Sequence, residues 1–276
     1  MATDWFTVKG DGKEFYCKVQ TILQYNSNPM YTISFGSKTE FCVTIAIKLD
    51  TVAYIDRVEY NELCVKDGVL PDGGTSTIVS VALWTIKQLF PRIETFTLTD
   101  DSYLYCIKKS KEYKLSLAYD YIVKYGETWY EKKFKAILPD KFYSDYKDSQ
   151  KVLDLPLDPF EYQSSRAPFL IKYKDVYSST KTPRDFITSL RETYGREYCK
   201  EVGPWLNRYM ECLKVVMFKD SWLIQMPSVL QPEGYELTKL TKVPLNQPRG
   251  GSRKTRKVQK NNDGSCHGYW NLEENY

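Results

Sequence analysis

The sequence predicts an α+β protein with a mixed sheet, antiparallel at first and parallel later, and flanking helices. Three observations indicate this fold. Strand-like segments follow one another closely over residues 13–60, which favours an antiparallel meander. A Gly-rich loop then opens into an amphipathic helix, and a strand-like segment follows that helix. A helical C-terminal extension and a basic tail complete the chain, so we divide it into residues 1–140, 141–245 and 246–276.

The first strands are rich in β-branched and aromatic residues and are separated by short turn-forming joins. The expected strands are Glu14–Leu23, Met30–Phe35, Phe41–Leu49 and Val52–Tyr60. Residues 43–47 alternate in side-chain character, which predicts one buried face for the third of these strands.

The first helix is expected over residues 78–90, where apolar residues form a broad stripe at helical spacing. Thr75 or Ser76 is the expected N-cap, and Pro91 ends the helix. Residues 93–100 then alternate as a strand. This strand–helix–strand succession predicts the parallel part of the sheet.

Caps and helix breakers predict the elements that follow. A helix over residues 116–125 stops at Gly126, a common C-terminal signal, and residues 128–134 form a short helical turn. Residues 141–180 are rich in Asp, Pro, Ser and Tyr and are expected to be irregular.

Two helices and a strand are expected in the extension. Thr182 followed by Pro183 predicts a capped helix that runs to about Cys199. A further helix is expected over residues 205–218, and a final strand over residues 222–226.

Composition excludes several kinds of site. The 276 residues contain one His, 23 Tyr and 6 Trp. The single imidazole, His267, cannot build a Ser-His-Asp triad or a His-rich metal site, and we expect no metal. The seven Cys are spaced too widely for a zinc ribbon, so we expect buried, reduced thiols in an intracellular protein. We expect neither a secretion signal nor a transmembrane helix.

Positive charge is concentrated at the C-terminus. The tail from Asn246 onward carries +3 of the net charge of +4. Such an arm suits nucleic acid, an acidic protein or a localisation receptor, and a solvated tail without a specific partner is the alternative. The aromatic segment Tyr269–Leu272 could dock on another protein. The basic residues of this tail are Arg249, Arg253, Lys254, Arg256, Lys257 and Lys260.

A loop with two glycines is the strongest chemical signal. Gly73 and Gly74 precede the helix that starts near Ser76, and backbone N–H groups at a helix N-terminus bind anions. The pattern lacks the Gly-Lys-Ser/Thr ending of a Walker A loop. An ordinary turn and helix start is the alternative interpretation.

The order of these elements resembles the GNAT superfamily, the acetyl-CoA-dependent N-acyltransferases. Residues 53–58 are similar to the strand that precedes the pyrophosphate loop of that family. Asp72–Thr75 resembles the loop, and Trp129–Phe134 resembles the late Leu-Tyr-Glu-Lys-x-Gly-Phe motif. The resemblance covers roughly residues 30–138. The chain departs from the pattern at Asp72, which places a negative charge beside the loop, and in the late motif, which lacks its Asn and its Gly.

The resemblance implies acetyl-CoA as the cofactor. The backbone amides of Gly73, Gly74, Thr75 and Ser76 are then the expected partners of its pyrophosphate. The Gln/Arg position of the family's loop falls on Leu70 or Pro71.

The resemblance also implies an acid and a base. Tyr130 is the expected acid for the leaving thiolate, and Asp56 or Glu59 is the expected base for the attacking amine. An ordinary buried or interface tyrosine is the alternative interpretation of Tyr130.

A second resemblance concerns uncharacterised GNAT-like proteins of large nucleocytoplasmic DNA viruses. It rests on Gly74-Thr75, Leu89–Ile93 and Leu98–Ser102, and on similar short runs over residues 116–131 and 198–206. It implies an intracellular or virion location. Two functions follow: a structural or interaction component, such as a minor capsid protein that contacts capsid proteins through aromatic surfaces, or an active acyl-CoA-dependent N-acyltransferase.

Overall fold

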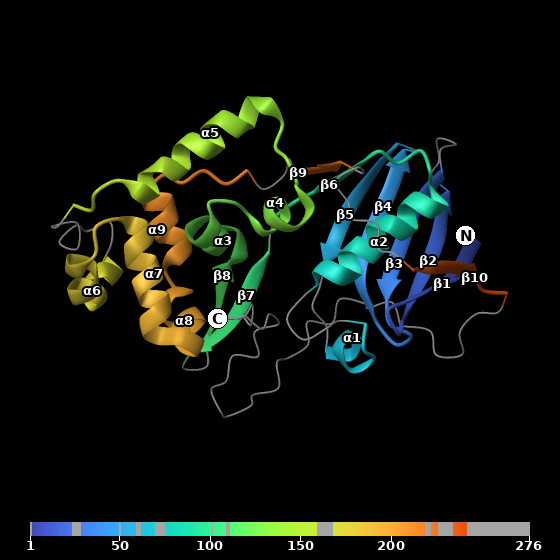
Figure 1. Ribbon diagram of the computed structural model, residues 1–276, viewed down its shortest axis with the longest axis horizontal. Coiled ribbons are helices and arrows are strands. Elements are labelled where there is room, and N and C mark those ends of the chain that lie inside the picture. Colours follow the sequence, from blue (N-terminus) through green and yellow to red (C-terminus); the bar gives the residue numbers. More distant parts are fainter. Residues whose placement is uncertain are drawn as a thin grey trace.

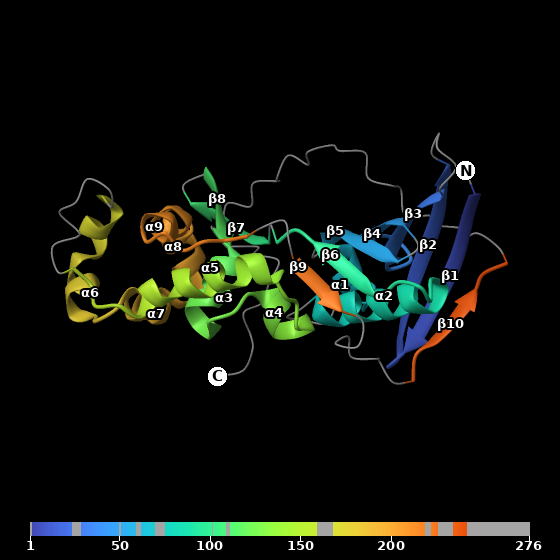
Figure 2. The ribbon, with the colours of Figure 1, turned by 90° about the horizontal axis from the view of Figure 1, so that it is seen from above.

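The computed structural model describes residues 2–23, 29–49, 51–58, 62–69, 75–100, 102–108, 111–158, 168–218, 222–225 and 234–241. These residues form an elongated molecule (Figures 1 and 2). A large sheet with α1 and α2 makes up one end, which we call the sheet lobe. A hairpin and the remaining helices make up the other end, which we call the helical lobe.

The sheet lobe is built on eight strands within the described residues, in the order β10-β1-β2-β3-β4-β5-β6-β9. Neighbouring strands are antiparallel except β5 and β6, which are parallel. The mixed sheet of the prediction is therefore confirmed. The strands are β1 Ala2–Gly10, β2 Lys13–Leu23, β3 Pro29–Gly36, β4 Phe41–Leu49, β5 Val52–Val58, β6 Thr95–Leu98, β9 Trp222–Gln225 and β10 Glu236–Lys239.

Two helices belong to the connection between β5 and β6. The short α1 spans Glu62–Lys66, and α2 spans Ser76–Leu89. Helix α2 lies across one face of the sheet (Figure 1) and buries its predicted apolar stripe, including Ile78, Val81 and Ile86. A parallel strand pair requires such a crossover, so the helix explains why the sheet changes from antiparallel to parallel at this point.

The helical lobe begins with a hairpin, β7 Tyr103–Lys108 and β8 Lys111–Ser116. Short helices make up the rest of this lobe (Figure 2). They are α3 Leu117–Tyr125, α4 Trp129–Phe134, α5 Asp140–Gln150, α6 Lys174–Ser179, α7 Pro183–Tyr194, α8 Tyr198–Val202 and α9 Leu206–Cys212, with 3₁₀ turns at Lys151–Asp154, Pro168–Tyr173 and Gly195–Glu197.

Local capping chemistry sets several helix ends. Gly126 ends α3 at a φ of 72°, the left-handed conformation that favours glycine. The Thr128 and Glu131 side chains form a reciprocal capping box at the start of α4. The Thr182 hydroxyl accepts from the Asp185 N–H at the start of α7. These three predicted boundaries are confirmed.

Other predictions were wrong. Residues 141–180 are not wholly irregular, because they include most of α5 and all of α6. The helix expected over residues 205–218 ends at Cys212. Thr75 is the N-cap of α2 by position, but its side chain makes no capping hydrogen bond. Strands β1, β7, β8 and β10 were not foreseen.

The expectation of reduced thiols was also wrong for four cysteines. Cys42 of β4 forms a disulfide with Cys64 of α1, and Cys106 of β7 forms one with Cys199 of α8. Their Cα–Cα distances of 6.8 and 5.8 Å suit such bonds. Cys17 is buried without a disulfide, and burial raises the pKa of its thiol to about 12. Among the described residues, each lobe thus contains one covalent cross-link.

The lobes meet at β9. Trp222 is fully buried, pairs with Leu98 of β6, and contacts the ring of Tyr146 in α5 edge to face at 5.4 Å. On the other side of β9, Leu223 exchanges two backbone hydrogen bonds with Ile137. The last strand on this side of the sheet is therefore shared between the sheet and the segment that follows α4.

Candidate functional site

The carboxyl ends of β5 and β6 lie at one edge of the sheet, because the two strands are parallel. Their pairing runs from Val52–Thr95 to Ile55–Leu98 and stops there, while β5 continues beside β4 as far as Val58. In open sheets with parallel strands, ligands bind at this edge. We call this region the β5–α2 corner.

Asp56 lies on a β-bulge at the corner. Thr44 of β4 pairs with Arg57 and Ile45 pairs with Ile55, so Asp56 is the additional residue in β5. A bulge bends the strand and redirects a side chain, and bulges are common beside active sites. The Asp56 side chain is exposed. This candidate base is accessible to an incoming amine.

The N-terminus of α2 supplies the second part of the corner. Thr75 is fully buried, and its hydroxyl has no hydrogen-bond partner among the described residues. A buried hydroxyl without a partner costs about 1–3 kcal/mol, so its presence calls for an explanation. Ser76 is partly exposed, and no acidic residue lies in the first turn of α2. A hydroxyl donor, backbone amides and the positive end of the helix dipole suit a phosphate oxygen.

Tyr130 lies on α4 and is 7% exposed. Its ring packs edge-on against Trp129, with centroids 4.7 Å apart, and also contacts Phe134. Burial and the nearby Asp100 carboxylate raise the pKa of Tyr130 well above its ordinary value. The structure therefore holds this hydroxyl in its protonated form and makes it a weak acid.

Asp100 was not identified from the sequence. It follows β6 by two residues, is 2% exposed, and accepts hydrogen bonds from the Ser102 backbone N–H and from the Ser102 hydroxyl. Asp100 lies just beyond the end of β6 and is close enough to Tyr130 to raise its pKa further than burial alone does, so Tyr130 also lies near the end of β6. Nothing in the sequence marks this role, since Tyr130 follows Asp100 by 30 positions and only the fold brings them together.

Several predicted site residues lie outside the part of the chain that the structure describes. These are the alternative base Glu59, the loop residues Gly73 and Gly74, and the basic residues of the tail, Arg249, Arg253, Lys254, Arg256, Lys257 and Lys260. Of the residues predicted to act, the structure describes Asp56, Thr75 and Ser76 at the corner and Tyr130 near the end of β6.

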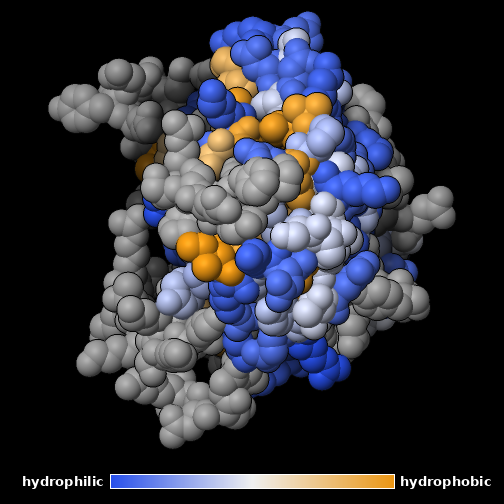
Figure 3. Space-filling view, turned by 90° about the vertical axis from the view of Figure 1, so that its left-hand side faces the viewer, coloured by the Kyte–Doolittle hydropathy of each residue, from blue (hydrophilic) through white to orange (hydrophobic). Residues whose placement is uncertain are grey.

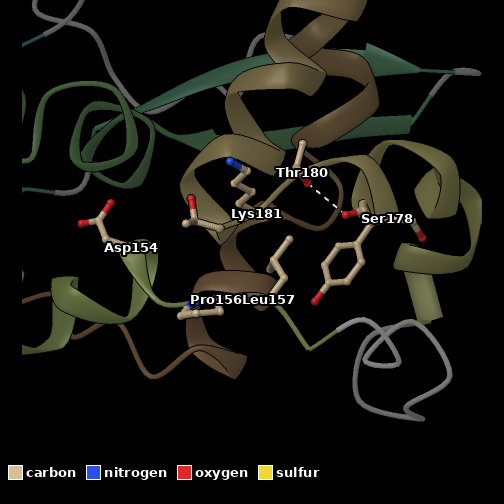
Figure 4. Close-up of a pocket in the computed structure, with 8 residues that line it drawn as sticks. Asp154, Pro156, Leu157, Ser178, Thr180 and Lys181 are labelled. Atoms are coloured by element: carbon tan, nitrogen blue, oxygen red, sulfur yellow. Dashed lines mark hydrogen bonds between the residues drawn. The ribbon is translucent and has the colours of Figure 1, made fainter.

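An open pocket of about 420 Å³ lies in the helical lobe, away from the corner (Figure 4). Asp154 lies at one side of it and forms a two-point ion pair with Arg184, with N–O distances of 2.6 and 3.1 Å. The Arg184 guanidinium holds the pKa of this carboxyl below its ordinary value. Its lining residues are Asp154, Pro156, Leu157, Tyr177, Ser178, Thr180, Lys181 and Thr182.

Metal ligands are not gathered anywhere in the described residues: no three His, Cys, Asp or Glu side chains come together to hold an ion. Within the same residues, no helix is both long and apolar enough to cross a membrane.

No protein-family model, curated protein or solved structure matches the chain. Function must therefore be argued from the residues and their geometry.

Proposed function

We propose that the chain is a GNAT-like protein that serves mainly as a structural or interaction component, such as a minor capsid protein of a large DNA virus. The environment of Tyr130 carries this proposal. A catalytic acid works best when its pKa lies near the working pH. Burial and Asp100 move the pKa of Tyr130 in the opposite direction, away from that range.

Comparison of pKa values shows whether a tyrosine can readily pass its proton to a thiolate. A thiol has an ordinary pKa of about 8.5 and tyrosine about 10, so transfer from an unperturbed tyrosine to a thiolate is already uphill. The raised pKa of Tyr130 makes this step more unfavourable. A chain that had kept acyl transfer would be expected to expose or activate its acid, whereas this one packs the ring against Trp129 and Phe134.

The helical lobe offers surfaces for partner proteins. Figure 3 shows its end of the molecule, where apolar patches interrupt a largely hydrophilic surface. Several large aromatic and aliphatic side chains of the helical lobe are exposed, including Tyr143 at 46%, Leu155 at 55% and Ile171 at 63%. Aromatic and aliphatic anchors of this kind are common in protein interfaces. The basic tail would add attraction for an acidic partner or nucleic acid.

The test is release of CoA from acetyl-CoA by the full chain, measured with a thiol reagent in the presence of a panel of primary amines. We expect no release above the rate without protein. Amine-dependent turnover that Tyr130→Phe abolishes would refute the structural role. A positive result for the structural role is recovery of the chain from purified virus particles together with capsid proteins.

An acyl-CoA-dependent N-acyltransferase is the second candidate, and the corner favours it. The fit to the cofactor rests on the unpartnered Thr75 hydroxyl, which together with Ser76 and the loop amides would hold the pyrophosphate. When bound, acetyl-CoA supplies the activated acetyl group. Asp56 on its bulge, or Glu59, would take the proton from the amine, and Tyr130 would hold the proton for the thiolate.

This candidate predicts that acetyl-CoA raises the melting temperature, because a ligand that binds only the folded state stabilises it. Thr75→Val should abolish that shift, whereas Thr77→Val, two residues further along the chain and outside the predicted loop, should retain it. Absence of a shift at millimolar acetyl-CoA would exclude the second candidate.

A further inference from the structure

Helix α1 is fastened to the turn between β3 and β4. The Cys42–Cys64 disulfide joins it to the start of β4, and the Thr39 hydroxyl donates to the Asp67 carboxylate at 2.5 Å. The turn itself is well fixed. The Ser37 hydroxyl accepts from the backbone N–H groups of Thr39 and Glu40. The turn is therefore a rigid anchor, and α1 is the part that can move.

Besides these two links, the partly buried Val65 of α1 packs against the core. The helix has five residues, too few for a stable isolated helix. Lys66, Asp67 and Gly68 at its end are exposed, and only Val69 beyond them is buried. Local opening of such a segment requires much less free energy than global unfolding. Cys64 itself is fully buried, so a reagent reaches the disulfide through this local opening.

The other disulfide lies in a different environment. Cys106 and Cys199 link β7 to α8, and Val202 of α8 is fully buried beside them. The packing is close: a Cβ added at Gly203 would lie 3.4 Å from the Cys106 sulfur. Cys106 is fully buried and Cys199 is 8% exposed, so exposing both sulfurs requires α8 to separate from the hairpin, which opens the core of the helical lobe.

We propose that Cys42–Cys64 is a redox-sensitive latch that holds α1, and that a dithiol reductant opens it while Cys106–Cys199 stays intact. A thiolate of the reductant attacks one sulfur and forms a mixed disulfide, and the second thiol of the reductant then resolves it. The protein gains two electrons and two protons as the Cys42 and Cys64 thiols, and the reductant leaves as a cyclic disulfide. Helix α1 then separates from the β3–β4 turn.

The latch also bears on the β5–α2 corner. Helix α1 lies beyond the end of β5 (Figure 1), in the connection from Asp56 on β5 to Thr75 at the start of α2. Because reduction removes the covalent anchor of this connection, the reduced form binds an anionic ligand at the corner more weakly. This consequence rests on the acyl-CoA candidate described above, whereas the latch itself does not.

The first experiment treats the folded full chain with dithiothreitol, alkylates the thiols and locates them by peptide mass spectrometry. Cys42 and Cys64 should become labelled about tenfold faster than Cys106 and Cys199, and trypsin should cleave after Lys66 about tenfold faster in the reduced form. Equal labelling of the two pairs, or equal cleavage of both redox forms, would refute the latch.

Two matched variants sharpen the result. Cys42→Ser/Cys64→Ser should be cleaved rapidly after Lys66 with or without reductant. Cys106→Ser/Cys199→Ser should keep the dependence of cleavage on reductant. If either variant fails to fold, removal of the reductant and reoxidation of the unmodified chain provides the control. Cleavage after Lys66 should then return to its slow rate, and failure to return would count against a reversible latch.

The corner is tested separately by titration with acetyl-CoA. The Kd should rise about tenfold in Cys42→Ser/Cys64→Ser and stay unchanged in Cys106→Ser/Cys199→Ser. Equal Kd values in the two variants would refute the effect on the corner. If no form binds acetyl-CoA, the acyl-CoA candidate and this consequence fall together, and the cleavage rates still decide whether the latch exists.

Discussion

The two lobes are held together by different means. The sheet lobe depends on backbone ladders around aliphatic side chains such as Val8, Ile33 and Ile45, all buried. Within the described residues, the helical lobe has a two-stranded ladder and helices of 5–12 residues. Helices of that length are not stable alone, so their stability comes from side-chain packing.

Stacked aromatic rings supply much of that packing. Trp205 lies at the centre of the group, with Phe169 stacked on it at 4.6 Å and Phe186 and Tyr209 at about 6 Å. Buried or partly buried ion pairs add specificity, including Asp120 with Arg191 and Glu131 with Lys147. The comparison indicates that the sheet lobe tolerates single side-chain changes better than the helical lobe does.

Removing the disulfides should give the largest difference between the lobes. The Cys106–Cys199 bond closes a sequence separation of 93 residues and the Cys42–Cys64 bond one of 22. In the chain-entropy description, Cys106→Ser/Cys199→Ser should lower the free energy of unfolding by about 4–5 kcal/mol and Cys42→Ser/Cys64→Ser by about 3 kcal/mol. Urea denaturation under non-reducing conditions measures both. A larger loss from the shorter loop would contradict the comparison.

Alkaline pH should destabilise the helical lobe first. Burial raises the pKa values of Tyr130, Tyr146 and Tyr198, and nearby carboxylates raise them further. Above pH ~10 the unfolded chain loses phenolic protons that the folded state keeps, so the stability is constant below that pH and falls above it. Each tyrosine should contribute a slope of about 1.4 kcal/mol per pH unit.

Tyrosinate absorbance near 295 nm should rise together with the loss of helical circular dichroism as the pH increases. Tyr130→Phe should make the fall in stability less steep by one tyrosine's contribution. Titration of these three tyrosines in the intact folded protein would contradict the prediction.

The Asp120–Arg191 pair is the next test. Asp120 is buried at 1% exposure, and its carboxylate accepts from the Arg191 guanidinium between α3 and α7. Asp120→Ala leaves a largely buried guanidinium without its partner and should lower the free energy of unfolding by about 3 kcal/mol. The exposed pair Lys151–Asp148 is the control, and Asp148→Ala should leave the free energy of unfolding almost unchanged. Similar losses in the two variants would show that burial of the pair is unimportant.

The smallest effect is expected in the sheet lobe, at its β10 edge. A Cβ added at Gly10 would lie 2.5 Å from the ring of Tyr235, so Gly10→Ala must displace that ring. We expect a loss of about 1–2 kcal/mol and faster hydrogen exchange confined to β1 and β10. In the double variant with Tyr235→Ala the alanine at position 10 should have little further effect. Additive losses would argue against this contact.

Sequence reasoning succeeded where the signal is local. Each confirmed signal acts on residues that are close to it in the sequence, so its effect can be predicted from the sequence. These signals are the apolar stripe of α2 and the capping residues Gly126, Thr128 and Thr182. Helix α5 was missed because its inward face is narrow: Phe142, Tyr146 and Gln150 recur every four residues in an otherwise polar segment. The inward-facing stripe of α5 ends in the polar residue Gln150, so a search for apolar residues at helical spacing does not detect it.

The site was harder to predict because it depends on distant partners. Asp56 and the start of α2 were predicted from the resemblance, which rests on the order of strand, loop and helix. The burial of Tyr130, its approach to Asp100 and the two disulfides depend on tertiary packing, and wide Cys spacing alone gives no pairing. The same packing turned the expected catalytic acid into the main argument for a structural role.

The path of the chain through the sheet has a consequence for biosynthesis. Strands β1 to β6 are made first, but β6 pairs with Trp222–Gln225 and β1 pairs with Glu236–Lys239, on opposite borders of the sheet. During translation both borders therefore stay unpaired until nearly all of the described chain has left the ribosome. Unpaired strand edges are templates for aggregation. A nascent chain of this design would benefit from a chaperone that covers the two borders until its last strands arrive.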